Sequence, residues 1–96
     1  MRKYEGLFIL KPNLSDEEYG KLSAAVVEVI TKNGGKVDGK EDLGTRDLAY
    51  PIKKDKKGRY FLAYFTTEPQ SITVMERVYK INESILRAVI FIHEAQ

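Results

Sequence analysis

The sequence predicts an α+β domain in which a four-stranded antiparallel sheet carries two helices on one face. Three observations support this prediction. The spacing of apolar residues switches between a period of two and a period near 3.6, in the order β-α-β-β-α-β. Ninety-six residues suit one domain, residues 1–96, with a single hydrophobic core. Right-handed crossovers then join the strands into the ferredoxin-like, or split β-α-β, sandwich.

The first two elements are a strand and a helix with clear end signals. Residues 4–10 alternate as a strand and are followed by a Lys-Pro-Asn turn. Ser15 and Glu18 form an S-x-x-E capping box, in which each side chain satisfies an otherwise unpaired backbone N–H. The helix that begins there should end at the Asn-Gly-Gly run that contains Gly34, because glycine tolerates positive φ.

The next two strands form a long hairpin at the edge of the sheet. We expect residues 37–52 to form an irregular edge strand. Gly39 and Gly44 favour bulges, and Pro51 has no N–H group to donate a hydrogen bond in a central ladder. Residues 60–66 should form the strand that pairs with it in antiparallel orientation.

The chain ends with a second helix and a last strand. Pro69 suits the first turn of a helix. The strand that follows spans residues 85–93. We expect four residues of the helix to face the core: Ile72, Met75, Val78 and Tyr79.

Alternation along the strands predicts which side chains the helices leave uncovered. The even positions of residues 85–93 are uniformly apolar, and we expect them, with Leu62 and Tyr64, to face the core. The opposite face would then carry one apolar patch of several hundred square ångströms, which a monomer seldom leaves uncovered. We expect the patch to consist of Leu7, Ile9, Phe61, Phe65, Val89 and Phe91. A second copy, another protein or stacked bases would cover it, unless lysine and arginine stems shield it.

The turn of the hairpin is strongly basic. Residues 53–59, KKDKKGR, carry five basic side chains and one carboxylate, a net charge of +4 that exceeds the +2 of the whole chain. Such a concentration of charge attracts polyanions, most commonly phosphate backbones. The alternative interpretation is a solvated turn whose lysines discourage pairing between sheet edges.

No motif for catalysis or for a bound metal stands out in the sequence. His93 is the only histidine, cysteine is absent, and none of the four serines lies in G-x-S-x-G. No glycine-rich phosphate loop occurs. We therefore expect no enzyme activity, no metal, no cofactor and no small-molecule substrate. The first apolar run is too short for a signal sequence or a membrane span, which favours a cytoplasmic protein with no membrane partner.

Two hypotheses about function fit this topology. Residues 57–64 faintly resemble the third-strand motif of the RNA-recognition motif, which stacks bases on aromatic side chains. That motif requires an aromatic residue where Arg59 stands and a small one where Tyr60 stands, and alternation turns Phe8 into the core. The rival from another class is a ligand-sensing regulator or dimeric enzyme that buries the open face against its own copy.

The chain resembles, from end to end, ribosomal protein six of the bacterial small subunit. The resemblance rests on MRKYE at 1–5, on LKPNL at 10–14 and above all on LAYPI at 48–52, which leads into the basic turn. It implies the ferredoxin-like sandwich that the periodicity predicts independently. It also implies a cytoplasmic, ribosomal protein that binds the central domain of small-subunit ribosomal RNA with ribosomal protein eighteen and aids assembly of the subunit.

Charge and position divide the expected contacts into two sets. Basic side chains near the hairpin and the N-terminus would contact phosphate and sugar groups, which position RNA without reading its sequence. These are Arg2, Lys3, Arg46, Lys54, Lys56, Arg59 and Arg87. The apolar patch would contact the protein partner. Since a net charge of +2 supports only weak RNA binding, we expect a free monomer that gains affinity through a more basic companion.

Overall fold

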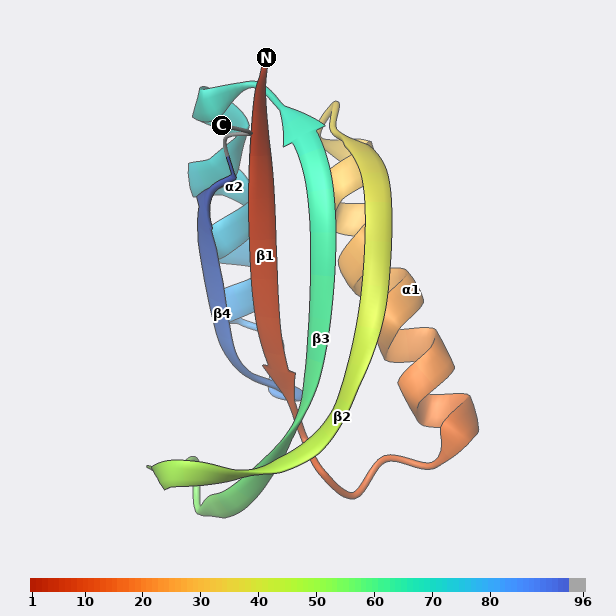
Figure 1. The fold of residues 1–96 in the computed structure, drawn as a ribbon, viewed down its shortest axis with the longest axis vertical. Helices are drawn as coiled ribbons and strands as arrows, with labels where there is room; N and C mark the ends of the chain where they lie inside the picture. Colours follow the sequence, from red (N-terminus) through yellow and green to blue (C-terminus); the bar gives the residue numbers. More distant parts are fainter. Residues whose placement is uncertain (94–96) are drawn as a thin grey trace.

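The structure, a computed structural model, describes residues 1–93 and confirms the predicted element order. Its strands form one antiparallel sheet in the order β2-β3-β1-β4, and Figure 1 shows both helices behind that sheet. One face is covered and the other is open, as the ferredoxin-like sandwich requires. The elements are β1 (Arg2–Leu10), α1 (Asp16–Lys32), β2 (Lys36–Ile52), β3 (Asp55–Thr67), α2 (Pro69–Lys80) and β4 (Ile85–Ile92).

Helix α1 begins and ends at the predicted residues. The Ser15 hydroxyl accepts a hydrogen bond from the Glu18 backbone N–H at 3.1 Å, and the Glu18 carboxylate accepts one from the Ser15 N–H at 3.0 Å. The capping box therefore satisfies two N–H groups that lack partners inside the helix. At the other end, Gly34 has a φ of +82°, a conformation that glycine adopts without steric cost.

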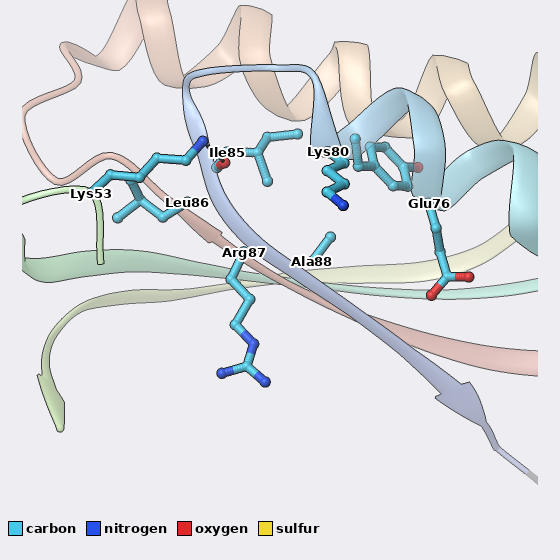
Figure 2. A pocket seen from close by; sticks show the side chains of 8 residues that line it. Lys53, Glu76, Lys80, Ile85, Leu86, Arg87 and Ala88 are labelled. Atoms are coloured by element: carbon cyan, nitrogen blue, oxygen red, sulfur yellow. Dashed lines mark hydrogen bonds between the residues drawn. The ribbon is translucent and has the colours of Figure 1, made fainter. Parts of the chain in front are cut away.

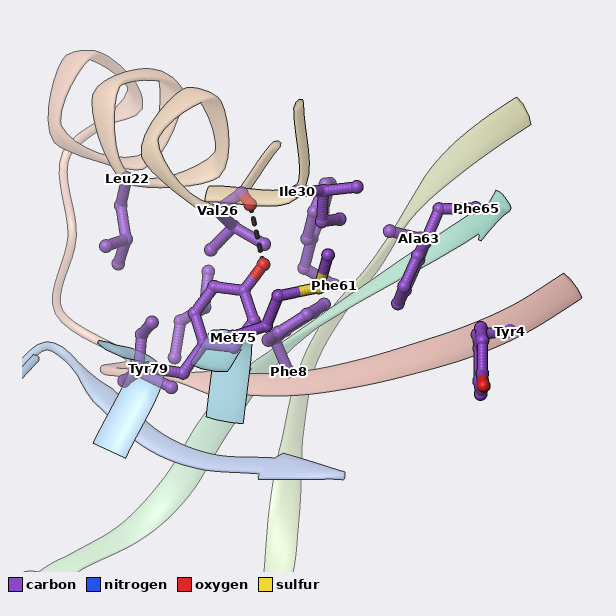
Figure 3. Close-up of a cluster of buried hydrophobic side chains, with 12 residues drawn as sticks. Tyr4, Phe8, Leu22, Val26, Ile30, Phe61, Ala63, Phe65, Met75 and Tyr79 are labelled. Carbon is purple, nitrogen blue, oxygen red and sulfur yellow. Dashed lines mark hydrogen bonds between the residues drawn. The ribbon is translucent and has the colours of Figure 1, made fainter. Parts of the chain in front are cut away.

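The core lies between the helices and the covered face of the sheet. Figure 3 shows the Tyr79 hydroxyl of α2 donating a hydrogen bond to the Val26 carbonyl oxygen of α1, at 2.7 Å. Burial raises the pKa of Tyr79, so this hydroxyl stays protonated. The core contains Tyr4, Phe8, Leu10, Leu22, Val26, Ile30, Phe61, Ala63, Phe65, Met75, Tyr79 and Ile85.

The register of the sheet corrects one part of the sequence prediction. Phe8 of β1 is directly opposite Phe61 of β3, and residues directly opposite each other share a face. Phe8 is buried beneath the helices, and so are Phe61 and Phe65. The predicted place of Phe61 and Phe65 on the open face is therefore wrong, whereas the predicted burial of Phe8 is confirmed. Leu62 and Tyr64, which alternation had assigned to the core, lie on the open face instead.

A smaller correction concerns α2. Val78 was expected to face the core, but it is 39% exposed, because Met75 and Tyr79 occupy the buried face of this helix.

The hydrogen bond between the two helices can be tested by removing one hydroxyl. Tyr79→Phe keeps the ring and loses only the bond to Val26, so we expect the free energy of unfolding to fall by about 1 kcal/mol. Urea unfolding followed by circular dichroism measures this change. Tyr60→Phe, on the open face, is the matched control and should leave the unfolding midpoint unchanged. Equal stabilities for Tyr79→Phe and the wild type would contradict this role.

Candidate functional site

The β2–β3 hairpin extends beyond the rest of the sheet. Strand β1 ends at Leu10, directly opposite Arg59, so β3 residues closer to the turn have no β1 neighbour. Figure 1 shows the hairpin projecting past the end of β1 and swinging toward the side of β4. The predicted basic turn thus lies at the tip of a two-stranded ribbon.

The turn itself has an unusual backbone. Ile52 pairs with Asp55, which leaves Lys53 and Lys54 as the two turn residues, with φ values of +49° and +73°. Two positive φ values are typical of the type I′ hairpin turn, which usually contains asparagine and glycine. For side chains with a Cβ, this conformation costs roughly 1–2 kcal/mol per residue. The turn therefore presents two lysines at a position where local backbone energy favours other residues.

The β2–β3 ladder contains three irregularities in its register. They lie between Val37 and Gly39, between Asp42 and Gly44, and between Asp47 and Ile52. The first two coincide with the glycines that predicted bulges, and the third spans Pro51. The predicted irregular edge strand is confirmed.

The bent hairpin reaches the beginning of β4. The Lys53 ammonium donates a hydrogen bond to the Ile85 carbonyl oxygen at 3.3 Å, and Arg87 donates one to the Tyr50 hydroxyl at 3.0 Å. Figure 2 shows Lys53 reaching toward Ile85, with Lys80 and Glu76 of α2 nearby. A groove of about 470 Å³ lies here, lined by Lys53, Glu76, Tyr79, Lys80, Ile85, Leu86, Arg87 and Ala88.

Four of the seven predicted RNA-contacting residues gather around the hairpin. Lys54 and Lys56 are exposed at the tip. Arg46 of β2 is also exposed, and its guanidinium lies 5.7 Å from the centre of the Tyr60 ring. Arg87 joins them through its bond to Tyr50. We group these four residues with Lys53 of the turn and call the five cations the tip surface: Arg46, Lys53, Lys54, Lys56 and Arg87.

Two predicted RNA contacts lie elsewhere. Arg2 is opposite Thr67, at the end of β3 farthest from the hairpin turn, and Lys3 is opposite Thr66. Both are exposed. The structure therefore does not bring Arg2 and Lys3 together with the tip surface.

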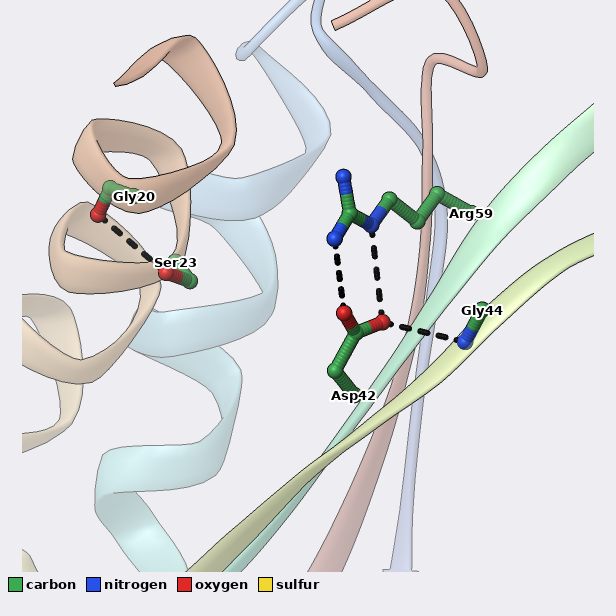
Figure 4. Close-up of polar contacts among 5 residues, drawn as sticks. All are labelled: Gly20, Ser23, Asp42, Gly44 and Arg59. Carbon is green, nitrogen blue, oxygen red and sulfur yellow. Dashed lines mark hydrogen bonds and ion pairs between the residues drawn. The ribbon is translucent and has the colours of Figure 1, made fainter. Parts of the chain in front are cut away.

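Arg59, the remaining member of that set, is engaged within the chain. Its Nη2 lies 2.7 Å from Asp42 Oδ2 and its Nε lies 3.4 Å from Asp42 Oδ1, as Figure 4 shows. Its guanidinium also lies 3.4 Å from the centre of the Tyr19 ring on α1. The side chain is 20% exposed and lies on the helix side of the sheet. No local sequence signal predicted these contacts.

The carboxylate of Asp42 also fixes the bulge beside it. Its Oδ1 accepts a hydrogen bond from the Gly44 N–H at 3.0 Å, where Gly44 has a φ of +83°. The hydrogen bond from Arg59 is the main cause that holds the pKa of Asp42 below its usual range. Burial and the Asp42 charge raise the pKa of Tyr19.

The open face has an apolar centre, although its members differ from the prediction. Leu7 is directly opposite Leu62 on one side and Val89 on the other, so the three side chains share this face. Tyr64 and Phe91 flank Glu5 in the same way, and Phe91 is 43% exposed. We call these five the open-face patch: Leu7, Leu62, Tyr64, Val89 and Phe91. Phe61 and Phe65 do not belong to it, because both are in the core.

Ile9 lies on the open side but is only 8% exposed. It packs against Gly58, where a Cβ would stand 2.4 Å from the Ile9 methyl group, with Leu48 of the hairpin nearby. Ile9 therefore supports the base of the hairpin more than it offers a contact surface.

The other end of the open face carries a polar cluster. His93 Nδ1 lies 3.3 Å from a Glu5 carboxylate oxygen, and its ring meets Tyr64 edge-on at 5.4 Å. Within residues 1–93, no group of three or more histidine and acidic side chains is arranged to hold a metal ion. No helix in this part of the chain has the length and apolarity needed to cross a membrane.

The base-stacking arrangement of the RNA-recognition motif is not available on this sheet. Arg59 and Phe61 occupy the motif positions that would stack bases, and both face the helices. Phe8 is buried, as alternation predicted.

Comparison with known proteins supplies the family. Residues 3–91 match the family model described as Ribosomal protein S6. Small ribosomal subunit protein bS6 of Helicobacter pylori is 47% identical over 96 residues, which cover 100% of this chain and 68% of that protein. The Nitratiruptor protein of the same name is 47% identical over 87 residues, which cover 91% of this chain and 68% of that protein.

Solved structures agree with this match. The crystal structure of 30S ribosomal protein S6 from Thermotoga maritima superimposes with a TM-score of 0.88 at 35% identity, covering 96% of this chain and 87% of that one. The C-terminal domain of MgtC from Mycobacterium tuberculosis, at 12% identity and a TM-score of 0.66, shares the fold alone. The chain belongs to the ribosomal protein S6 family and is a structural component of the small subunit of the cytoplasmic ribosome.

Proposed function

We propose that this chain binds the central domain of small-subunit ribosomal RNA together with ribosomal protein eighteen, and aids assembly of the subunit without catalysing a reaction. One observation carries the proposal: in a member of this family, an exposed basic hairpin tip adjoins an uncovered apolar sheet face. The two surfaces differ in chemistry, which suits two different macromolecules.

The tip surface is the proposed RNA contact. Lys54 and Lys56 project from the turn, and Arg46 and Arg87 flank its base. Exposed ammonium and guanidinium groups bind phosphate oxygens and release condensed counterions. The hairpin bends toward β4, and this bend favours contact of these charges with a single RNA segment.

Arg2 and Lys3 are proposed as a separate, secondary RNA contact. They lie at the far end of β3 from the tip, so one short RNA segment cannot meet both groups. A folded RNA that spans the sheet can meet both. Arg59 is proposed to act indirectly, because its guanidinium already binds Asp42 and covers Tyr19.

The open-face patch is the proposed site for ribosomal protein eighteen. Its centre, formed by Leu7, Leu62 and Val89, is apolar, and Tyr64 and Phe91 add large rings at one end. Tyrosine and phenylalanine are enriched in protein interfaces, and the buried centre of an interface is more apolar than the rest of the surface. Leu62 and Tyr64 lie on the open face, where Phe61 and Phe65 were expected, and the patch is apolar with either pair.

The low net charge makes the companion necessary. With only +2 over 96 residues, the chain alone neutralises few phosphates. We propose that the chain is a monomer when free and that its open face binds a more basic companion. The combined surface of the two proteins then binds a folded RNA junction. This order explains how a nearly neutral chain contributes to tight binding.

The RNA role of the tip can be tested by charge reversal. We expect Lys54→Glu combined with Lys56→Glu to weaken RNA binding and to reduce the slope of log affinity against log salt by roughly two, about one per lost phosphate contact. A filter-binding titration at several salt concentrations measures both quantities. Lys21→Glu with Lys32→Glu on α1 makes the same change in net charge, away from the tip, and is the matched control. Equal slopes for the two double variants would refute the tip contact.

The partner role of the open-face patch can be tested separately. We expect Leu62→Glu to cost about 2 kcal/mol or more of affinity for ribosomal protein eighteen, because it places a charge in the centre of the apolar patch. RNA affinity of the chain alone should stay unchanged, while the gain on adding the companion should disappear. Val74→Glu, at an exposed apolar residue on α2, is the control and should preserve the gain. If Leu62→Glu kept the full gain, the companion would have to dock elsewhere, and a stable homodimer in light scattering would favour the dimeric rival.

A further inference from the structure

Arg59 stands at the point where the hairpin leaves the sheet. Leu10, the last residue of β1, is its partner across the ladder. On the tip side of this pair, the β2–β3 ribbon has lost its β1 neighbour. A two-stranded ribbon is marginally stable alone and twists more than a full sheet, so its direction depends on what holds its base.

Three elements meet at this base through Arg59. The guanidinium binds both oxygens of Asp42 on β2, with its shortest contact at 2.7 Å, and it lies 3.4 Å from the centre of the Tyr19 ring on α1. Asp42 in turn holds the Gly44 bulge through a hydrogen bond of 3.0 Å. We call Asp42, Arg59 and Tyr19 the Arg59 clamp.

The clamp is anchored on the core rather than on the surface. The Tyr19 ring meets the buried Phe61 ring edge-on, with 6.3 Å between centroids. Arg59 is two residues before Phe61 on the same strand and therefore points to the same face. A planar guanidinium can bind a carboxylate with two bonds and stack on a ring at the same time, and a lysine ammonium cannot.

From this arrangement we infer that Arg59 and Asp42 are positioning residues for RNA binding: they fix the direction in which the hairpin presents the tip surface, and Arg59 does not itself contact phosphate. The inference rests on the proposed function for its RNA readout. It assigns a role to the acidic Asp42, which charge alone would exclude from an RNA-binding site.

Removing Asp42 gives opposite results under the two roles. If Arg59 contacted phosphate, Asp42→Asn would free its guanidinium and delete a repelling charge, so RNA affinity would rise. If the clamp fixes the hairpin, Asp42→Asn leaves the hairpin without a fixed direction. If the freed hairpin occupies the binding direction about one tenth of the time, the apparent affinity falls about tenfold.

The RNA experiment uses the chain with its companion and measures affinity at several salt concentrations. We expect Asp42→Asn and Arg59→Gln each to weaken binding about tenfold with the salt slope of the wild type, because the phosphate contacts remain. Arg59→Lys, which keeps the charge, should also be weak. Lys56→Gln is the control for a direct contact and should lower the slope by about one. Tighter binding by Asp42→Asn, or full affinity for Arg59→Lys, would overturn the inference.

A second experiment needs no RNA. The chain has no cysteine, so Lys21→Cys on α1 and Lys56→Cys at the tip give one unique pair of spin labels. We expect a narrow distribution of label distances that broadens with Arg59→Gln or Tyr19→Leu. Tyr19→Phe should stay narrow, because it keeps the ring on which the Arg59 guanidinium stacks. Identical widths for all variants, in chains that unfold cooperatively, would contradict the clamp.

The two experiments separate the clamp from the proposed function. A wild type that binds no RNA with its companion would contradict the proposed function, and the label distances would still decide the clamp. If the wild type binds RNA and the distribution of label distances is unchanged by Arg59→Gln, the clamp alone is contradicted.

Acid provides a further readout of the same contact. The pKa of Asp42 is lowered in the folded chain, so its contribution to stability is present above the unfolded value of 3.8 and is lost as pH falls through the lower folded value. Arg59 and Tyr19 face the Asp42 carboxylate. Lys40 and Glu41 line a pocket together with Asp42, and the Asp16 charge acts on Arg59. We expect the difference in unfolding free energy between wild type and Asp42→Asn to shrink below pH 3.8. A difference that stayed constant with pH would contradict the ion pair.

Discussion

The pairing of β1 with β3 sets which side chains of the sheet are covered by the helices and which remain on the open face. Leu7 opposite Leu62 and Phe8 opposite Phe61 decide which side of β3 faces the helices. A shift of one residue would exchange the two sides, because neighbouring side chains of a strand point in opposite directions. The same pairing fixes where β1 ends, and hence where the hairpin begins to project.

Because β1 ends at Leu10, the hairpin beyond that residue has no β1 neighbour. Beyond Leu10 and Arg59 the ribbon is free to reach a second macromolecule, and it is also free to move. The contacts of Lys53 with Ile85 and of Arg87 with Tyr50 hold its far end, and the Arg59 clamp holds its base. The turn places two lysines at positive φ values, where backbone preference favours asparagine and glycine.

Much of the fold could be predicted from sequence because its signals are local. The capping box of Ser15 and Glu18, and the glycines beside the first two bulges of β2, act over a few residues. The facing of β3 could not be predicted, because both of its alternating sets contain aromatic and small or aliphatic side chains. Only pairing with Phe8, more than fifty positions away along the chain, distinguishes them.

The same difference between local and distant signals explains the site. The basic tip is visible in seven consecutive residues. Arg59 belongs to that run by sequence, yet it contacts Asp42 and Tyr19, which are 17 and 40 positions away. Charge counting placed it with the phosphate contacts, whereas from its contacts we infer that it holds the direction of the hairpin. Family resemblance identified the ribosome but could not make this distinction.

We propose that two partners use two adjoining surfaces of this sheet. Backbone amide shifts of the isotopically labelled chain, recorded first with RNA and then with ribosomal protein eighteen, test this proposal. We expect RNA to shift amides of the tip surface, including Lys54, Lys56 and Arg87, and the companion to shift those around Leu7, Leu62 and Val89. Shifts centred on the exposed sides of α1 and α2 with either partner would contradict it.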